Sequence, residues 1–227
     1  MSGERSWSGL TAAEFVTALA EENHAALERL GDLSRAGEAP ESLTVPRLLR
    51  VALKNEFEAS ELAAIWMAST PELDIKLALA RQVGDEARHY RLIAERLTSL
   101  GVDVKGIDPR EGGYSPLFDY LASLEGAAAR VAAGQFTREG IALVRNQCFI
   151  EFCESAGDLE TAALYRDTIQ PDERHHHESG RALLEIYGGS HEAQNKARQA
   201  ALRTIELAEE IQETARLRAG IMRAPGC

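Results

Sequence analysis

The sequence predicts an all-α protein whose helices form a bundle. Apolar residues recur at spacings of three and four along almost the whole chain, and no segment alternates with period two for long enough to make a strand. Alanine, leucine and glutamate are abundant, while aromatic residues make up only 6%, a composition that favours helix over sheet. A hydrophobic content of 44% over 227 residues is enough for the core of one large domain.

The first helix is expected over residues 11–33. Thr11 can cap it, and Glu14, three residues later, completes a capping box. A loop follows at residues 36–42. Residues 1–43 are therefore expected to pack on the bundle as an N-terminal helix and loop.

The bundle itself is expected over residues 44–188. Its first helix has Pro46 in the first turn, a position that proline tolerates well. The string STPE, residues 69–72, ends this helix, and the next one runs over residues 71–100. The two helices should form a hairpin.

A long crossover is expected at residues 101–136. It begins with GVDVKGIDPREGGYSP, which is rich in glycine and proline and predicts an irregular connection, and it includes a short helix at residues 117–133. Thr137 starts the helix that carries IALVRNQCFIEFCES, and a further helix carries a run of three histidines and ends near Gly188.

Residues 189–227 are expected to form a C-terminal helix, at residues 191–219, and a tail. An apolar stripe on this helix predicts that it packs along the outside of the bundle or against a partner subunit. The stripe consists of Ala201, Ile205, Ala208, Ile211 and Ala215.

Two Glu-x-x-His motifs are the strongest chemical signal in the chain, Glu86 with His89 and Glu173 with His176. Residues three apart on a helix are neighbours on one face, so each motif presents a carboxylate and an imidazole pointing the same way. In the run of histidines at residues 175–177, the two outer rings are rotated by about 100° from the central one. His176 is therefore the histidine that works with Glu173.

Each motif is preceded by an acid on an earlier helix, Glu56 in NEFEAS and Glu151 in IEFCES. The likeness of the two strings indicates an internal repeat. Glu86 lies 30 residues after Glu56, so a hairpin that turns halfway turns at residue 71, inside STPE. The two side chains then sit at the same height above the turn and can meet.

The acid of the second half has three candidates. Glu151 lies 22 residues before Glu173, which places the turn within LETAALYR, a string without a helix breaker. Glu139 lies 34 residues before Glu173 and places the turn beside the glycine of SAGD, and Glu154 lies one turn after Glu151. The repeat favours Glu151, and Glu139 and Glu154 stay open.

With these motifs in this order, residues 44–188 resemble the ferritin-like di-iron carboxylate superfamily. That superfamily takes one glutamate from each of two helices and Glu-x-x-His from each of the other two. The resemblance implies a four-helix bundle that holds two iron ions, or manganese or a mixed pair, with Glu86 and Glu173 as bridging ligands. It implies six metal ligands, Glu56, Glu86, His89, Glu151, Glu173 and His176.

Two further acids, Asp85 and Asp172, each stand one residue before a motif glutamate. We expect each of them to orient the ligand imidazole of the opposite half. No catalytic residue beyond the metal ligands is expected.

The resemblance implies an oxidoreductase that activates O2 to oxidise or hydroxylate a small or carrier-bound organic substrate. The alternatives are a ferroxidase or iron-handling protein, and a metal-free helical scaffold. A net charge of −11 argues against a nucleic-acid partner, and no apolar run approaches the ~20 residues that span a membrane. Three cysteines without a paired motif and the lack of a signal peptide predict a cytoplasmic protein, with a homodimer as the expected assembly.

Overall fold

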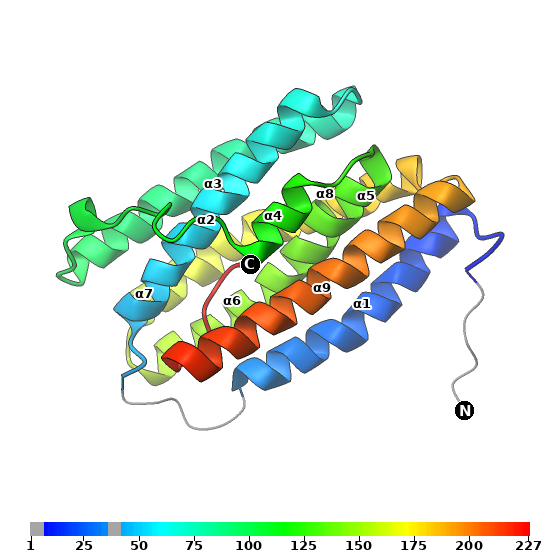
Figure 1. Cartoon of the computed structure of the whole chain (residues 1–227). Helices are drawn as coiled ribbons and strands as arrows, with labels where there is room; N and C mark the ends of the chain where they lie inside the picture. Colours follow the sequence, from blue (N-terminus) through cyan, green and yellow to red (C-terminus); the bar gives the residue numbers. More distant parts are fainter. Residues whose placement is uncertain (1–6, 36–41) are drawn as a thin grey trace.

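The computed structural model describes residues 7–35 and 42–227, and Figure 1 shows that helices joined by loops make up this part of the chain. No strand occurs among the described residues, which confirms the prediction of an all-α protein. Most of the loop predicted at residues 36–42 lies outside the described residues.

The first helix, α1 (Ala12–Arg35), begins with the predicted capping box. The backbone N–H of Thr11 donates to Glu14 Oε2 at 2.8 Å, and the backbone N–H of Glu14 donates back to Thr11 Oγ1 at 3.3 Å. Two backbone donors that the helix itself leaves unpaired are thereby satisfied.

Helices α2 (Val45–Ser69) and α3 (Leu73–Ser99) form the predicted hairpin. Pro46 lies in the first turn of α2, where its missing N–H costs no hydrogen bond. Gly101, just after α3, has φ +83°, a left-handed conformation that favours glycine at a helix end. Both predicted helices are therefore confirmed within a few residues.

The crossover differs from its prediction. A helix starts at Ala127 and continues through Thr137, which was expected to begin a new one. The break lies earlier, at Gly126, which has φ +84°. The helix continues through Gly134. A Cβ at this position would lie 2.5 Å from Trp66 Cζ3, so glycine lets the two helices approach closely. The elements of this region are η1 (Val104–Gly106), α4 (Pro116–Ala122), α5 (Ala127–Val131), the π-helical segment η2 (Ala132–Arg138) and α6 (Glu139–Ser155).

The second hairpin turns after α6, at Gly157, which has φ +77°. The return helix is continuous from α7 (Leu159–Leu164) through the π-helical segment η3 (Tyr165–Ile169) to α8 (Gln170–Tyr187). Pro171 follows directly on the π-helical turn, so the proline is placed where the regular hydrogen-bond ladder is already shifted.

Helix α9 (His191–Ala219) has the predicted bounds and lies beside α1 along one side of the bundle (Figure 1). Ala201 and Ala208 of its apolar stripe are fully buried against the rest of the chain. The stripe therefore packs on the bundle, which confirms that alternative. After α9, residues 220–227 fold back between α2 and α6, where Asn55 Nδ2 donates to Pro225 O at 2.9 Å.

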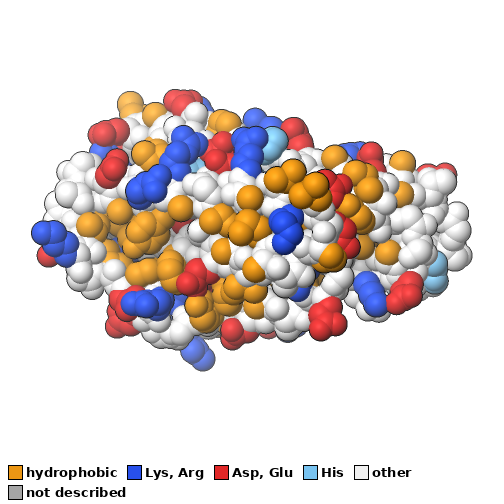
Figure 2. Space-filling model, turned by 90° about the horizontal axis from the view of Figure 1, so that it is seen from above, with side chains coloured by type: hydrophobic (Ala, Val, Ile, Leu, Met, Phe, Trp, Pro, Cys, Tyr) orange, Lys and Arg blue, Asp and Glu red, His pale blue; other side chains and the backbone are white. Residues whose placement is uncertain are grey.

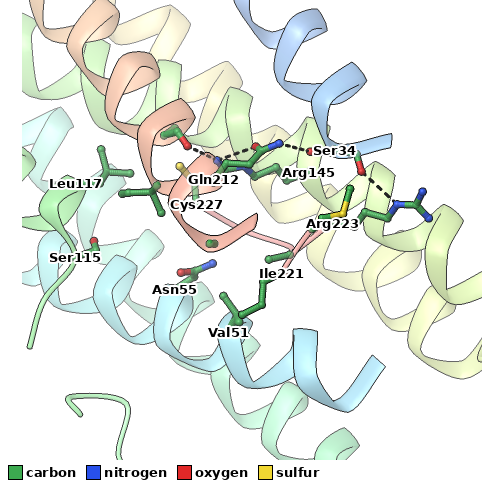
Figure 3. A pocket seen from close by; sticks show the side chains of 15 residues that line it. Ser34, Val51, Asn55, Ser115, Leu117, Arg145, Gln212, Ile221, Arg223 and Cys227 are labelled. Carbon is green, nitrogen blue, oxygen red and sulfur yellow. Dashed lines mark hydrogen bonds between the residues drawn. The ribbon is translucent and has the colours of Figure 1, made fainter. Parts of the chain in front are cut away.

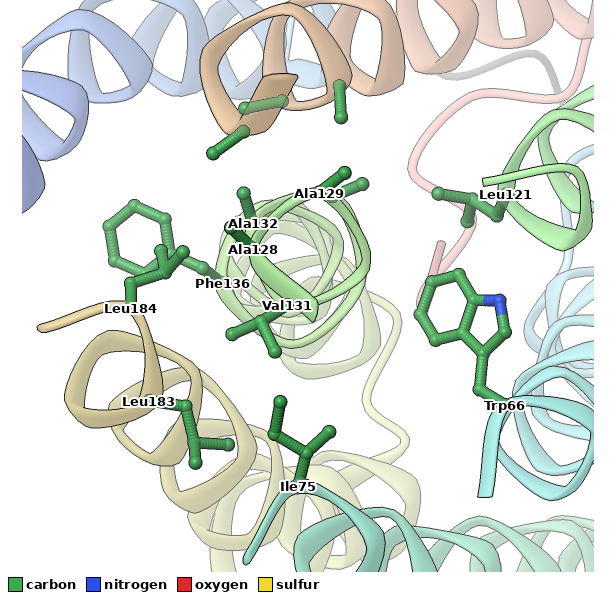
Figure 4. Close-up of a cluster of buried hydrophobic side chains, with 14 of the residues drawn as sticks. Trp66, Ile75, Leu121, Ala128, Ala129, Val131, Ala132, Phe136, Leu183 and Leu184 are labelled. Carbon is green, nitrogen blue, oxygen red and sulfur yellow. The ribbon is translucent and has the colours of Figure 1, made fainter. Parts of the chain in front are cut away.

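Four helical runs, α2, α3, η2–α6 and η3–α8, each contribute to two large apolar clusters. Trp66, Phe136 and Leu184 belong to the first cluster, part of which is seen in Figure 4, while Leu49 and Phe149 belong to the second. Following the chain, α2 and η3–α8 run from the second cluster to the first, and α3 and η2–α6 run from the first to the second. Helices α3 and α6 therefore point the same way, which is why a long crossover joins them.

Helix α8 packs against η2 at very short range. A Cβ added to Gly180 would lie 2.7 Å from the backbone of Gln135 and Phe136. Only glycine permits this approach, which brings the histidine-bearing helix onto the segment just before α6.

The surface carries charges of both signs. Figure 2 shows one face on which apolar patches alternate with acidic and basic side chains, so the net charge of −11 is not concentrated there. Within residues 7–35 and 42–227, no helix is long and apolar enough to cross a membrane.

Candidate metal centre

Six ionisable side chains meet between the two apolar clusters, at mid-length of the bundle. They come from α2, α3, α6 and α8, and none is more than 3% exposed. The six are Glu56, Glu86, His89, Glu139, Glu173 and His176.

The six side chains fall into two groups with the spacing of metal ligands. Within each group, one ligand atom from each residue lies within 4.8 Å of the others. Both groups contain Glu86 and Glu173, the two carboxylates that the sequence indicated as bridging ligands. The first group adds Glu56 and His89, and the second adds Glu139 and His176.

The sequence favoured Glu151 as the acid of the second half. This prediction is wrong, because Glu151 does not lie in the cluster. Its side chain is 43% exposed and accepts a hydrogen bond from Arg35 Nε at 3.0 Å. Glu154, the other candidate, is also on the surface, paired with Arg166. Glu139, the remaining candidate, lies in the cluster instead.

The position of the turn between α6 and α7 explains why Glu139, and not Glu151, lies in the cluster. The hairpin turns at residues 156–158, halfway between Glu139 and Glu173. The turn that Glu151 required would fall inside α7, which is helical. The resemblance between NEFEAS and IEFCES is therefore not a structural repeat, since Glu56 and Glu151 occupy different positions relative to the cluster.

Each imidazole points its Nδ1 atom into the cluster. His89 Nδ1 lies 3.4 Å from Glu56 Oε2 and 3.3 Å from Glu86 Oε2. His176 Nδ1 lies 3.7 Å from both Glu86 Oε1 and Glu173 Oε2. Nδ1 of each ring is thus directed at the space between the carboxylates.

The opposite nitrogen of each ring faces an aspartate of the other half, as the sequence predicts. His89 Nε2 lies 3.1 Å from Asp172 Oδ2, and His176 Nε2 lies 3.1 Å from Asp85 Oδ2. An aspartate at Nε2 holds the proton there, which leaves Nδ1 free to act as a ligand. This reciprocal pairing links α3 and α8 on both sides of the cluster.

Two further residues contact the cluster that the sequence did not single out. Gln82 Nε2 donates to Glu139 Oε1 at 2.7 Å and to Glu86 Oε1 at 3.3 Å. Arg138 Nη1 lies 3.4 Å from Glu139 Oε1. The spacing of Gln82, four residues before Glu86, could have indicated that it shares the inner face of α3.

Without cations the cluster is electrostatically unfavourable. Burial raises the pKa of Glu56 to about 7, and burial together with the charges of Glu86 and Glu139 raises the pKa of Glu173 far above its ordinary value. Burial disfavours the charged form of His89, but its hydrogen bonds with Glu56 and Glu86 outweigh this and raise its pKa to about 11. Protons therefore occupy positions that cations would otherwise fill.

Two of the six residues also keep polar atoms without hydrogen-bond partners. They are His176 Nδ1 and Glu173 Oε2, both buried and both aimed at the cluster. An unpaired buried polar atom costs about 1–3 kcal/mol, and a cation bound by these two atoms would remove that cost. Carboxylate oxygens and imidazole nitrogens are donors that suit iron and manganese.

The chain's own tail closes the cluster on one side. A small internal cavity beside the carboxylates is bordered by Asn55, Gly226 and Cys227 as well as by the site residues. The backbone N–H of Gly226 donates to Asn146 Oδ1 at 2.8 Å, and Arg138 donates to the main-chain oxygen of Cys227. Residues 226 and 227 therefore shield the cluster from solvent on the side of α2 and α6.

We compared the chain with known proteins, and no family model, curated protein or solved structure matches it.

Proposed function

We propose that this chain is a ferritin-like two-metal protein that holds two iron ions, or manganese or a mixed pair, between Glu86 and Glu173. The observation that carries the proposal is the pair of overlapping groups, each with three carboxylates and one imidazole. Four carboxylates balance two divalent cations, which removes the cost of burying so many acids together. The parallel direction of α3 and α6 and the long crossover between them also fit this superfamily.

The residues around the centre would prepare it in distinct ways. Asp85 and Asp172 fix the proton on Nε2 of the two ligand rings, and Gln82 orients Glu139 by donating to its Oε1 atom. Arg138 supplies a positive charge beside Glu139, and the tail excludes water. A metal pair in this setting supplies the redox chemistry that activates O2.

We further propose that the activity is the O2-dependent oxidation of an organic substrate. An apolar cavity adjoins the cluster, sharing Asn55 and Cys227 with it, and offers a place for an organic molecule. Helices α1 and α9 cover faces of the bundle. An iron-storage protein must pack such faces against other subunits, so these two helices favour an oxidase over an iron-storing cage.

Elemental analysis of protein purified without added metal tests the proposal. We expect about two iron or manganese ions per chain and O2 consumption when the reduced metal-loaded protein is mixed with oxygenated buffer. Particles of cage size on a sizing column would instead favour iron storage. Protein that contains no metal and takes up none would leave only a helical scaffold.

A matched pair of variants tests the ligand assignment. Glu139→Ala should lose at least one of the two ions, because Glu139 completes the second group. Glu151→Ala should keep both, because Glu151 is a surface residue on the same helix. Helix content by circular dichroism should stay near native in both variants, and equal metal content in the two would remove Glu139 from the ligand set.

A further inference from the structure

A cavity of about 110 Å³ lies between α2, α4, α6, α9 and the tail, as seen in Figure 3. Most of its wall is apolar, with Val51, Leu117, Ile211 and Ile221 among the lining residues. A cavity of ~150 Å³ is known to hold benzene, so this one has room for a molecule of a few carbon atoms.

Two arginines border the cavity, and Arg145 is the buried one. Arg145 is 9% exposed, and its guanidinium donates to Ala208 O at 2.8 Å and to Gln212 Oε1 at 3.3 Å. Among the described residues no carboxylate pairs with it. A buried cation without an anion is unfavourable, which indicates that an anion from outside the chain completes the site.

The second arginine that borders the cavity has different partners. Arg223 donates to the main-chain oxygens of Ser34 and Arg35 at 3.2 and 3.3 Å, and its guanidinium lies over the ring of Phe152. The guanidinium of Arg223 therefore already has partners at the rim of the cavity. A single guanidinium in an apolar cavity suits a carboxylate better than a phosphate dianion, which requires more charge.

The position of Arg145 also sets the direction of the ligand. It lies seven residues after Arg138 on the same helical run, a rise of about 10 Å. Asn55 and Cys227 separate this cavity from the smaller one beside Glu56 and Glu139. A molecule whose acid group is held at Arg145 can therefore direct its apolar end toward the metal centre.

We propose that this cavity binds a small monocarboxylic acid with a short apolar chain, with Arg145 pairing with the carboxylate. The inference deepens the proposed function by naming a substrate class, and only the oxidation of this ligand rests on the metal centre. Binding itself requires only the cavity and the guanidinium.

Isothermal titration of the full chain with hexanoate, 1-hexanol and hexylamine tests the proposal. We expect hexanoate to bind at least about tenfold more tightly than 1-hexanol, since a charge-assisted hydrogen bond is lost with the alcohol, and hexylamine to bind most weakly. Equal affinity for hexanoate and 1-hexanol, or no binding of hexanoate, overturns the proposal.

Two substitutions test separately the charge of Arg145 and the volume of the cavity. Arg145→Met should abolish the preference for hexanoate over 1-hexanol, because methionine keeps the apolar wall without the charge. Ala215→Phe fills the cavity and should abolish binding of both, whereas Thr214→Phe adds the same ring to the exposed side of the same turn and should leave both affinities native. Retention of native hexanoate affinity in Ala215→Phe overturns the proposal even if Arg145→Met does not fold.

The titrations are run on metal-free and metal-loaded protein, which keeps the two proposals distinct. Hexanoate binding that depends on Arg145, in protein that takes up no metal, would sustain this inference and remove the proposed oxidation. Two bound metal ions without hexanoate binding would do the reverse.

Discussion

At the residue scale, substitution of the two aspartates that face the imidazoles tests whether they position the metal-binding rings. Asp172 Oδ2 lies 3.1 Å from His89 Nε2, and this contact decides which ring nitrogen carries the proton. Asp172→Ala should weaken metal binding about 10–100-fold, the usual effect of losing such a partner. Chelator competition measures the change, and Asp167→Ala, on the exposed side of the same helix, serves as the control. Native affinity in Asp172→Ala would show that the aspartate does not position the ring.

Five of the six residues in the cluster were predictable from sequence. Four of them form the two Glu-x-x-His pairs, whose spacing fixes a shared helix face, and Glu56 follows from the position of the turn between α2 and α3. Glu139 was only one of three possibilities. The string IEFCES resembles NEFEAS, but Glu151 points away from the cluster toward Arg35. Which face of α6 is inward depends on where its hairpin turns and on the π-helical turn before it. The glycine of SAGD marks the hairpin turn in the sequence, but no local pattern reveals the π-helical turn. Gln82 belongs to no motif, and only its spacing of four from Glu86 points to it. Arg138 has no such signal, so only packing identifies it.

At the element scale, the contact of α8 with η2 depends on Gly180. A Cβ there would lie 2.7 Å from backbone atoms, which cannot yield as a flexible side chain can. Gly180→Ala should lower the free energy of unfolding by about 1–3 kcal/mol in urea titration, the usual cost of overpacking. Gly84→Ala, in α3 with no atom within 4 Å of its added Cβ, should be neutral or stabilising by up to ~1 kcal/mol. Equal effects of the two substitutions would show that helix propensity, and not close packing, sets the role of Gly180.

The tail offers a second test at this scale. Gly226 has φ +73°, and a Cβ there would also approach Asn55 Cβ to 3.3 Å. Gly226→Ala should loosen the tail and speed the loss of bound metal to a chelator severalfold, because residues 226 and 227 cover the cluster. Gly189→Ala, with open space at its Cβ, should release metal at the native rate. An unchanged rate in Gly226→Ala would mean that metal leaves by another path.

The elements themselves were largely predictable, since long amphipathic helices have a strong periodic signal. The bounds of α9 matched, and those of α1, α2 and α3 differed by a few residues. The crossover was less predictable: a helix was expected to end at residue 133 and another to begin at Thr137, whereas one helix runs through both, and Gly134 within it accommodates Trp66. Such a close approach depends on residues almost 70 positions away, which no local pattern records.

At the scale of the whole molecule, the buried cluster makes the stability of the metal-free protein depend on pH. The pKa values of Glu56, about 7, and of His89, about 11, both exceed their ordinary values of 4.5 and 6.5. At a pH between the ordinary and the raised pKa of either group, the folded state binds more protons than the unfolded state. The free energy of unfolding therefore falls as pH rises. The lowered pKa of Glu86 acts only below pH 4.5 and does not oppose this trend.

We therefore expect metal-free protein to lose on the order of 1 kcal/mol of stability per pH unit between about pH 6 and 9. Urea unfolding at several pH values measures the slope. Metal-loaded protein should show a much flatter profile, since cations replace the protons. A metal-free protein that is more stable at pH 9 than at pH 6 would contradict the burial of these groups.

Anomalous X-ray diffraction from crystals of the native protein, collected at the iron or manganese absorption edge, shows directly whether the cluster binds metal. We predict two peaks about 3.5–4 Å apart. Glu86 and Glu173 should lie between them, with Glu56 and His89 at one peak and Glu139 and His176 at the other. Anomalous peaks located elsewhere, or a cluster of carboxylates without any peak in metal-replete crystals, would contradict it.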